Sequence, residues 1–264
     1  MNLWNYYAGD LKYPNVTMYS HEKEIAKANP KWAFDYVSKH GKDKDLEPAI
    51  AKSAYHSFWY AKLVLKGSFK LGEKAIAKNT KESYYYAKYI LNAQPFPLGE
   101  KIIAKTAEYS YLYAAEVLKK SFKLGEKAIA TNAQYSFFYA KNILKKPFPL
   151  GEKAIATDAQ YSYMYANGIL NGPFPLGEKA IATSAEFSYL YAHDVLKGAF
   201  KLGEKAIATD YHYACYYAIY VIKTSFELGE PAIAKDALHS LRYTDIILKK
   251  DFYLDGKLIY KYKG

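Results

Sequence analysis

The chain has 264 residues, and 51% of them are hydrophobic, which is enough for a packed core and argues against a disordered chain. Lysine and arginine outnumber aspartate and glutamate by 37 − 26 = 11, so an acidic partner is permitted but not required. The single cysteine, Cys215, excludes an internal disulfide, and the lack of any apolar run of about 18 residues excludes a membrane-spanning helix.

Residues 1–20 contain no basic leader, no long apolar stretch and no small-residue cleavage site. We interpret them as part of the folded protein and expect them to cap the N-terminal end of the segments that follow. The lone cysteine suits a reducing compartment, so we expect a cytoplasmic protein.

A repeat of about 26 residues occupies residues 21–248. Its marker leucine, followed by Gly-Glu in all but the last copy, stands at Leu71, Leu98, Leu124, Leu150, Leu176, Leu202, Leu228 and Leu254. Every step is 26 residues except the first, which is 27. Weaker copies at residues 21–37 and 46–52 bring the total to nine units and a terminal half unit. A fixed period of this kind is typical of an array in which each unit packs on its neighbours.

Each unit predicts two helices. The first, helix A, is the short run "LGEKAIA", which Pro97, Pro149 or Pro175 opens in three copies. The second, helix B, begins after a residue whose side chain can cap a helix N-terminus. These capping residues are Ser53, Asn79, Thr106, Asn132, Asp158, Ser184, Asp210 and Asp236, and Asn29 before Pro30 has the same role in the first unit.

Positions in helix B are numbered from a small residue, which is Ser57, Ser83, Ser110, Ser136, Ser162, Ser188, Ala214 or Ser240. Positions +3, +4, +7 and +8 carry Tyr, Ala, Val or Ile, and Leu, which is the spacing of one apolar helix face. Positions −2, +5 and +9 are mostly polar. Gly67, Gly172 and Gly198 are predicted to end helix B in three copies, and lysine in others.

Neither helix is long enough to be stable alone in water. Stacking of neighbouring hairpins solves this problem, so the sequence predicts an all-α solenoid of two-helix repeats, with a short helix A, a longer helix B and a right-handed superhelix.

The pattern "GEKAIA(T/K)(D/N/S)A(E/Q)YSYxYAxx(V/I)LKG" resembles the tandem short helical-hairpin repeats found in proteins of bacteriophages and other large DNA viruses, and the match extends over residues 22–248. The resemblance implies a virus-encoded protein in the host cytoplasm. It implies no particular activity, because none belongs to the family as a whole. Tetratricopeptide and Sel1-type arrays are architectural relatives with longer periods.

The sequence shows no arrangement of residues typical of a catalytic or cofactor site. The run "GPFPLGEK" at residues 172–179 resembles a phosphate-binding loop, but Glu178 stands where the lysine should be. His212 and Cys215 lie three residues apart, but further metal ligands are missing and a core thiol is the favoured interpretation. The glutamate in the first turn of helix A recurs in equivalent environments, which does not suit a catalytic acid. We therefore expect no enzyme, no cofactor and no metal.

Two repeated features are candidate binding surfaces. Position +2 of helix B is mostly apolar but differs between copies, so it presents varied side chains on a fixed scaffold, with packing between units as the alternative. The lysine after Gly-Glu predicts a ladder that could follow a phosphate backbone, with a solvated face balanced by the glutamates as the alternative. The candidates are Trp59, Tyr85, Phe138, Met164 and Tyr216 at position +2, and Lys74, Lys101, Lys127, Lys153, Lys179 and Lys205 in the ladder.

Residues 249–264 break the repeat and are predicted to cap its C-terminal end, with "KLIYKYK" as a strand or a basic docking peptide as alternatives. The leading functional hypothesis is a non-enzymatic scaffold that binds a protein partner through its helical surface. Sequence-tolerant nucleic-acid binding through the lysines and tyrosines is one alternative, and self-assembly into a ring or filament is another.

Overall fold

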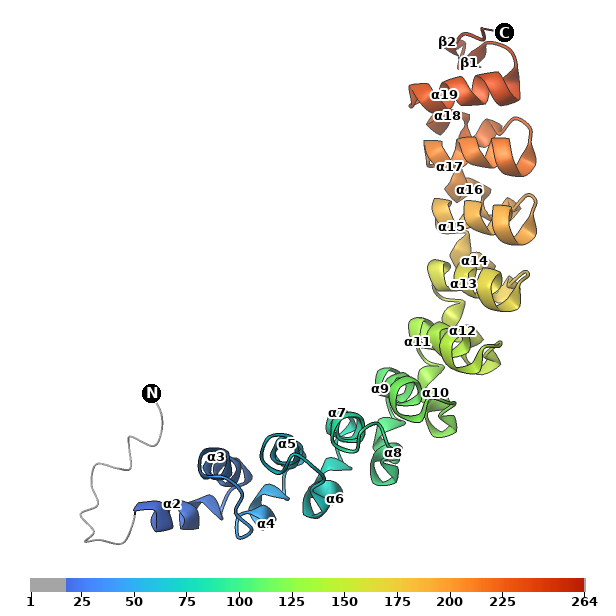
Figure 1. Cartoon of the computed structure of the whole chain (residues 1–264). Coiled ribbons are helices and arrows are strands. Elements are labelled where there is room, and N and C mark those ends of the chain that lie inside the picture. Colours follow the sequence, from blue (N-terminus) through green and yellow to red (C-terminus); the bar gives the residue numbers. More distant parts are fainter. Residues whose placement is uncertain (1–17, 264) are drawn as a thin grey trace. The chain divides into compact units, whose positions relative to one another are not determined.

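The computed structural model describes residues 18–263 (Figure 1). The predicted N-terminal cap falls outside this range except for residues 18–20, which begin helix α2 (Met18–Ala26). The chain divides into two compact units: the first runs to Lys105 and includes Glu116–Leu118, and the second comprises Thr106–Ala115 and the chain from Lys119 onward. Helix pairs repeat along both units, so the fold is an all-α solenoid, as predicted.

Nine helix pairs follow one another in the described part of the chain, and the first consists of α2 and α3 (Pro30–His40). In most later pairs helix A is a 3-10 turn, denoted η, that leads into a four-residue α-helix. These helices A are α4 (Glu47–Ile50), η2 and α6 (Lys70–Gly72, Glu73–Ile76), α8 (Pro97–Ile103), η5 and α10 (Lys123–Gly125, Glu126–Ile129), η7 and α12 (Pro149–Gly151, Glu152–Ile155), η9 and α14 (Pro175–Gly177, Glu178–Ile181), η11 and α16 (Lys201–Gly203, Glu204–Ile207), and η13 and α18 (Glu227–Gly229, Glu230–Ile233).

Helix B of each later pair begins as an α-helix and continues as a π-helix, also denoted η. These helices B are α5 and η1 (Ala54–Trp59, Tyr60–Leu65), α7 and η3 (Thr80–Tyr85, Tyr86–Ile90), α9 and η4 (Ala107–Leu112, Tyr113–Leu118), α11 and η6 (Ala133–Phe138, Tyr139–Leu144), α13 and η8 (Ala159–Tyr165, Ala166–Leu170), α15 and η10 (Ala185–Leu190, Tyr191–Leu196), α17 and η12 (Tyr211–Tyr216, Tyr217–Ile222), and α19 and η14 (Ala237–Tyr243, Thr244–Leu248).

The predicted N-caps of helix B are confirmed in all but one hairpin. Asp158 is typical: its backbone is extended and its side chain accepts a hydrogen bond from the N–H of Tyr161 at 2.9 Å. Thr106 is the exception, because it has the extended backbone of a cap but no capping hydrogen bond from its side chain.

The π segments explain why the predicted apolar face is only partly buried. Tyr at +3 and Ala at +4 are fully buried, as Tyr165 and Ala166 show, whereas Ile169 at +7 and Leu170 at +8 are half-buried. In a π-helix each N–H bonds to the carbonyl five residues earlier, so the wider turn moves later side chains away from the face that an α-helix would give them. The α-helical spacing predicted from the sequence therefore holds only for the first half of helix B.

Helix B ends at a left-handed residue, which corrects the prediction for Gly67, Gly172 and Gly198. The residue before each glycine carries the positive φ, as in Asn171 with a φ of 50°. The same left-handed position is occupied by Lys66, Lys119, Lys145, Lys197, Lys223 and Lys249 in the other hairpins. The 27-residue step is absorbed here too, since Asn92 and Ala93 both have positive φ.

A set of equivalent buried residues, which we call the buried frame, holds each hairpin together and joins it to the next. The Tyr165 hydroxyl donates to Glu152 of the same hairpin at 2.9 Å and accepts from the N–H of Phe148 at 2.8 Å. The Tyr165 ring meets the ring of Phe174 in the next hairpin at 5.2 Å, edge to face. Both hydrogen bonds recur for Tyr86, Tyr139, Tyr191, Tyr217 and Tyr243.

Serine and glycine complete the buried frame where two hairpins approach most closely. The Ser136 hydroxyl donates to the carbonyl of Ile129, at the C-terminus of its own helix A, at 2.9 Å. A Cβ on Gly151 of the next hairpin would lie 2.6 Å from the Ser136 Oγ and 2.6 Å from Phe148. This contact requires glycine in "LGE" and a small residue at the origin of helix B.

The C-terminal tail forms an antiparallel hairpin of strands β1 (Phe252–Leu254) and β2 (Lys257–Tyr260), which agrees with the strand interpretation of "KLIYKYK". Its turn has positive φ at Asp255 and Gly256. Phe252 is buried and packs edge to face on Tyr243 at 5.5 Å, which is the contact that the phenylalanine of a following hairpin makes elsewhere. The tail therefore covers the end of the last helix pair through Phe252.

Candidate functional site

We call positions +2 and +6 of helix B, which lie one turn apart, its outward stripe. The variable position +2 is half-buried in every hairpin from Trp59 to Tyr216, while Arg242 is exposed. Its neighbours explain the partial burial. Phe138 lies 6.2 Å from Tyr111 of the preceding hairpin and 6.2 Å from Tyr161 of the following one. Phe138 therefore packs between hairpins and remains partly exposed, so packing between units accounts for part of its surface and the binding role stays a prediction.

In the first unit this stripe forms a cluster of aromatic rings and lysines. The Lys62 ammonium lies 5.1 Å from the centre of the Trp59 ring and 4.9 Å from that of Tyr89. The rings of Tyr85 and Tyr89 stack at 5.7 Å. Cation–π contacts of this kind hold a cation over an aromatic face that remains partly accessible. Tyr89 itself is 48% exposed.

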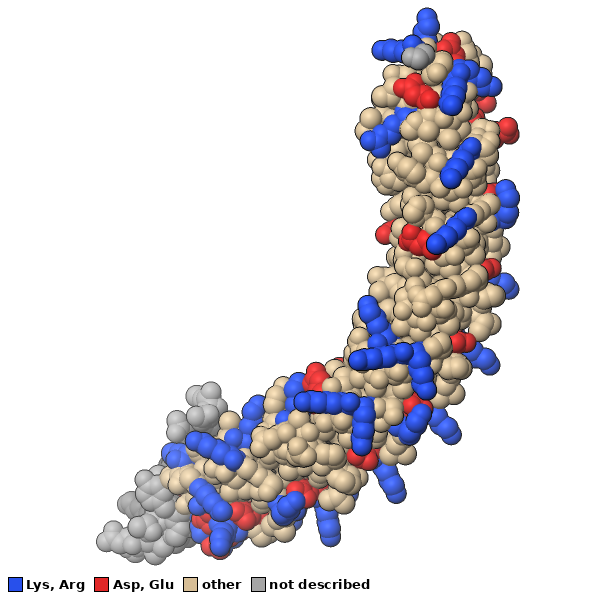
Figure 2. All heavy atoms as spheres, turned by 45° about the vertical axis from the view of Figure 1, so that its right-hand side comes forward, with Lys and Arg blue, Asp and Glu red and all other residues tan. Residues whose placement is uncertain are grey.

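The predicted lysine ladder is exposed. In the second unit it consists of Lys127, Lys153, Lys179 and Lys205. Figure 2 shows Lys and Arg side chains projecting along this unit, with Asp and Glu side chains among them. None of these four lysines takes part in an ion pair within residues 18–263. The neighbouring glutamates accept hydrogen bonds from the buried tyrosines, and two of them, Glu126 and Glu204, also pair with Lys123 and Lys201 outside the ladder.

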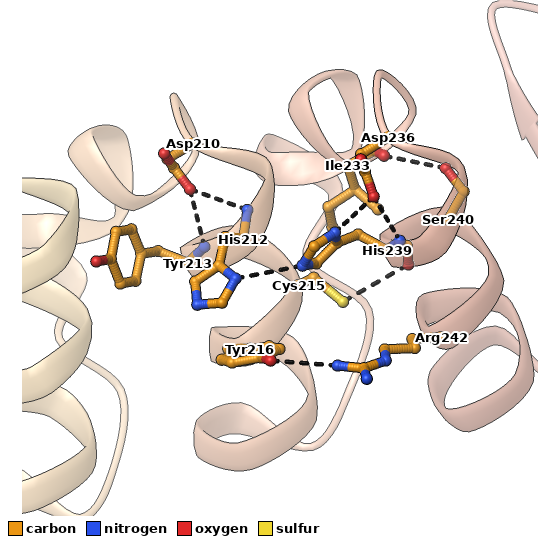
Figure 3. Close-up of polar contacts among 10 residues, drawn as sticks. All are labelled: Asp210, His212, Tyr213, Cys215, Tyr216, Ile233, Asp236, His239, Ser240 and Arg242. Carbon is orange, nitrogen blue, oxygen red and sulfur yellow. Dashed lines mark hydrogen bonds and ion pairs between the residues drawn. The ribbon is translucent and has the colours of Figure 1, made fainter.

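A polar junction between hairpins lies between α17 and α19 (Figure 3). His239 is only 8% exposed; its Nδ1 lies 2.6 Å from an Asp236 oxygen, and its Nε2 lies 3.3 Å from the Nδ1 of His212. The hydrogen bond from His239 holds the pKa of the Asp236 carboxyl below its usual range. Next to these hydrogen bonds, the Arg242 guanidinium donates to the Tyr216 hydroxyl at 3.2 Å, which joins two successive +2 positions.

Cys215 lies in the same junction but takes no part in the hydrogen bonds that link Asp236, His239 and His212. It is fully buried, its thiol donates to the carbonyl of His239 at 3.6 Å, and burial raises its pKa to about 11. It is therefore a core thiol, as the sequence indicated. Within the described residues, no group of three or more His, Cys, Asp or Glu side chains is placed to hold a metal ion.

The repeated glutamates form pairs with buried tyrosines that the sequence analysis missed. Burial, followed by the hydrogen bond to the carboxylate, raises the pKa of Tyr217 well above its usual range, and burial raises that of Tyr191 to about 12. A neutral hydroxyl that bridges a carboxylate and a backbone N–H is a structural element. The constant spacing of 13 residues between glutamate and tyrosine was the available signal.

A second missed feature is the exposure of the marker leucines. Leu150 and Leu176 are 53% and 60% exposed, and the equivalent leucines of the other "LGE" hairpins are similar. They lie in the 3-10 turn that opens helix A, whose inward contacts are made by the glycine and the preceding phenylalanine. A leucine in an apolar pattern is normally assigned to the core, which explains the omission.

Comparisons with protein-family models, with curated proteins and with solved structures give no match for this chain. In the part of the chain that the structure describes, the helices are all too short or too polar to cross a bilayer.

Proposed function

We propose that this chain is a non-enzymatic scaffold that binds a protein partner through the outward stripe of helix B. The observation that supports the proposal is the combination of a repeated buried frame with a variable stripe. Trp59, Phe138, Met164 and Tyr216 stand at one equivalent position, half-buried, on helices that the frame holds in place. Rigid, partly exposed aromatic side chains are the residues that most often dominate protein interfaces.

The test is affinity capture from the cell in which the chain is expressed, followed by mass spectrometry of protein and nucleic acid. We expect a defined protein to be retained by the native chain and lost from a variant with Phe138→Ser, Met164→Ser and Tyr216→Ser. A matched control carries Lys127→Gln, Lys153→Gln and Lys179→Gln and should retain the protein. Equal recovery by the stripe variant, or a turnover that depends on one side chain, would contradict the proposal.

Nucleic-acid binding is the second candidate, because the ladder lysines are exposed and pair with no carboxylate in the part of the chain that the structure describes. Binding to a single strand should then weaken steeply with salt, with a slope of about −0.7 for each phosphate contact. The three ladder substitutions above should reduce that slope by about 2, while the stripe variant should leave it unchanged. Absence of binding at low salt would eliminate this candidate.

The resemblance to repeats of bacteriophage and large DNA virus proteins adds a proposal about the setting. It favours a virus-encoded factor whose partner is a host protein in the host cytoplasm. Identification of the captured protein in the experiment above tests this directly, since a partner encoded by the same genome as the chain would contradict it.

A further inference from the structure

One edge of the second unit contains the turns that join each helix B to the next helix A. We call it the connecting edge and define it by residues 119–124, 145–150, 171–176, 197–202 and 223–228. Each of these segments starts at a left-handed residue and ends at an exposed marker leucine. The connecting edge is distinct from the outward stripe of helix B, and the same two features recur in every segment.

The apolar feature of the connecting edge is its leucines. They are Leu124, Leu150, Leu176, Leu202 and Leu228, with exposed fractions between 52% and 60%. Scattered exposed leucines are ordinary, but leucines repeated at one position of successive hairpins form an apolar line along one edge. The buried frame does not need these side chains, since the glycine and phenylalanine beside each leucine make the contacts with the preceding hairpin.

The charged feature is the lysine at the left-handed position, which occurs in every segment except the one that begins at Asn171. Glycine adopts this backbone conformation without the cost of about 1 kcal/mol that other residues incur. Gly198 follows Lys197 directly and yet lies outside the positive-φ region. The lysines are exposed, and none of them has an ion pair among the residues described. Favourable interaction with the helix C-terminus offsets part of the cost.

The leucines and lysines border shallow grooves between hairpins. One groove is lined by Lys201, Glu204 and Ile222 of one hairpin and by Thr224 and Leu228, which lead into the next. Lys223 lies between Ile222 and Thr224 in the sequence. The Glu204 carboxylate already accepts from the Tyr217 hydroxyl at 2.8 Å and pairs with Lys201 at 3.1 Å.

A second groove one hairpin later has equivalent walls, including Leu248 and Phe252. Glu227 is an exposed acidic side chain on this edge, in the position that is lysine or proline in the other "LGE" hairpins. Three of the four segments of the connecting edge between residues 119 and 202 contain lysines, and none of the four contains aspartate or glutamate.

We propose that the connecting edge of the second unit binds an acidic protein segment in extended conformation, with an apolar side chain about every third residue. This goes beyond the proposed function, because it assigns a second binding surface and the chemistry of the segment that this surface binds. Packed helices lie about 10 Å apart, and an extended chain advances about 3.3 Å per residue, so three residues of partner span one hairpin. The lysines complement acidic side chains, and the leucines favour a partner with apolar groups, which a phosphate backbone lacks.

The probe is a fluorescein-labelled peptide of six Glu-Glu-Leu repeats, with affinity measured by fluorescence anisotropy at pH 7. We expect the full chain to bind it and the variant Lys145→Gly, Lys197→Gly, Lys223→Gly to bind about tenfold more weakly. Because glycine suits the left-handed position, this variant should unfold at the same or a higher denaturant concentration. Loss of binding is thus separated from loss of fold.

A second variant tests the apolar feature. Leu150→Ser, Leu176→Ser and Leu202→Ser together should weaken binding by a similar factor, because each leucine would bury its exposed surface against the peptide. An oligoglutamate of the same length should bind the native chain more weakly than the repeat peptide. Unchanged affinity in either variant would overturn the proposal.

Two further probes address the other polyanions. Single-stranded oligo-dT and vesicles containing phosphatidylserine should each bind more weakly than the peptide, and tighter binding of either would replace the proposed partner. The outcome is independent of the proposed function as tested by capture. If the captured protein is lost from the stripe variant but retained by both edge variants, the scaffold function stands and the connecting edge is not its binding surface.

Discussion

Hairpins 149–172 and 201–223 share their interior and differ at their surface. Both hold a buried tyrosine, Tyr165 or Tyr217, between a glutamate and a phenylalanine N–H at distances that differ by no more than 0.2 Å. Their outward stripes have little in common, since the second has Tyr216 and Tyr220 where the first has Met164 and Gly168. The interior positions repeat because they set how one hairpin packs on the next. The outward positions vary in identity, although some of them, such as Tyr216, also contact the next hairpin.

The largest expected effect tests the shared interior of both hairpins at once. Burial raises the pKa of Tyr191 to about 12, and burial with carboxylate hydrogen bonding raises that of Tyr165 and Tyr217 further. The native state therefore favours the protonated hydroxyls. Their contribution to the free energy of unfolding is complete below the unfolded pKa of about 10 and is lost as pH rises through the folded pKa values. We expect cooperative unfolding between about pH 10 and 12, measured by far-ultraviolet circular dichroism. Helicity that stays constant across this range would contradict it.

The second prediction separates two glycines of hairpin 149–172. Gly151→Ala places a Cβ 2.6 Å from Phe148 and Ser136, so the joint with the preceding hairpin must open, at a cost of about 3 kcal/mol. Gly168→Ala is the control, because nothing lies within 4 Å of its Cβ position and alanine is the better helix former. Chemical denaturation of both variants measures the difference. Similar midpoints would show that the close approach is not required.

The third prediction concerns the tyrosine hydroxyl that the two hairpins share. Tyr165→Phe leaves the buried N–H of Phe148 without its acceptor and removes the bond to Glu152, which should cost about 2 kcal/mol. Tyr161→Phe is the control, since Tyr161 is half-buried on the same helix. This substitution should lower the free energy of unfolding by no more than about 0.5 kcal/mol. If both variants unfold alike, the hydroxyl bridge adds nothing to stability.

A reciprocal exchange between the hairpins has a smaller effect. Ser162 donates to the carbonyl of Ile155, whereas Ala214 occupies the equivalent position of hairpin 201–223. Ser162→Ala should lose about 1 kcal/mol, and Ala214→Ser should gain up to about that amount by restoring the bond to its own helix A. Thermal unfolding of the two variants and of the double exchange checks both signs. A loss in both single variants would show that the two sites are not equivalent.

The smallest effect is confined to the junction that hairpin 201–223 makes with α19. The hydrogen bond from His239 lowers the pKa of Asp236. The Asp236 carboxylate therefore adds to the free energy of unfolding above its unfolded pKa of about 4, and this addition is lost as pH falls through the folded pKa. Asp236→Asn keeps a capping side chain and should flatten this acid dependence. Asp158→Asn is the matched substitution, at a cap of hairpin 149–172 where Tyr161 stands in place of the histidine. Amide hydrogen exchange of residues 237–248, the helix that Asp236 caps, is compared below pH 4 between the native chain and the Asp236→Asn variant.

The sequence predicted the helix pairs, their N-caps and the cap at the C-terminal end, because each depends on local residue chemistry. It did not predict the π segments, since the spacing of Tyr165, Ala166, Ile169 and Leu170 fits an α-helix equally well in a pattern. Lysine was predicted to end helix B in several copies, but the left-handed residues before Gly67, Gly172 and Gly198 were missed because glycine is the usual residue for that conformation. Which polar groups meet across a junction, such as His212 and His239, depends on stacking geometry that spacing alone does not supply.

The outcome for the candidate surfaces follows the same division. Exposure of the ladder lysines could be anticipated from their place beside glutamate in helix A. Exposure of Leu150 and its equivalents could not, because only the close packing of Gly151 shows that the hairpin interior is already complete without leucine. The binding roles of both surfaces stay predictions until the experiments above are done.

The contact of Tyr243 with Phe252 has a consequence for how such a protein can change its length. The tail meets the last helix pair through the same ring contact that one hairpin offers the next. Duplication or deletion of one whole 26-residue segment would therefore leave a compatible joint at both of its boundaries. Recombination between repeats could extend or shorten the molecule in single steps, with the same tail serving every resulting size.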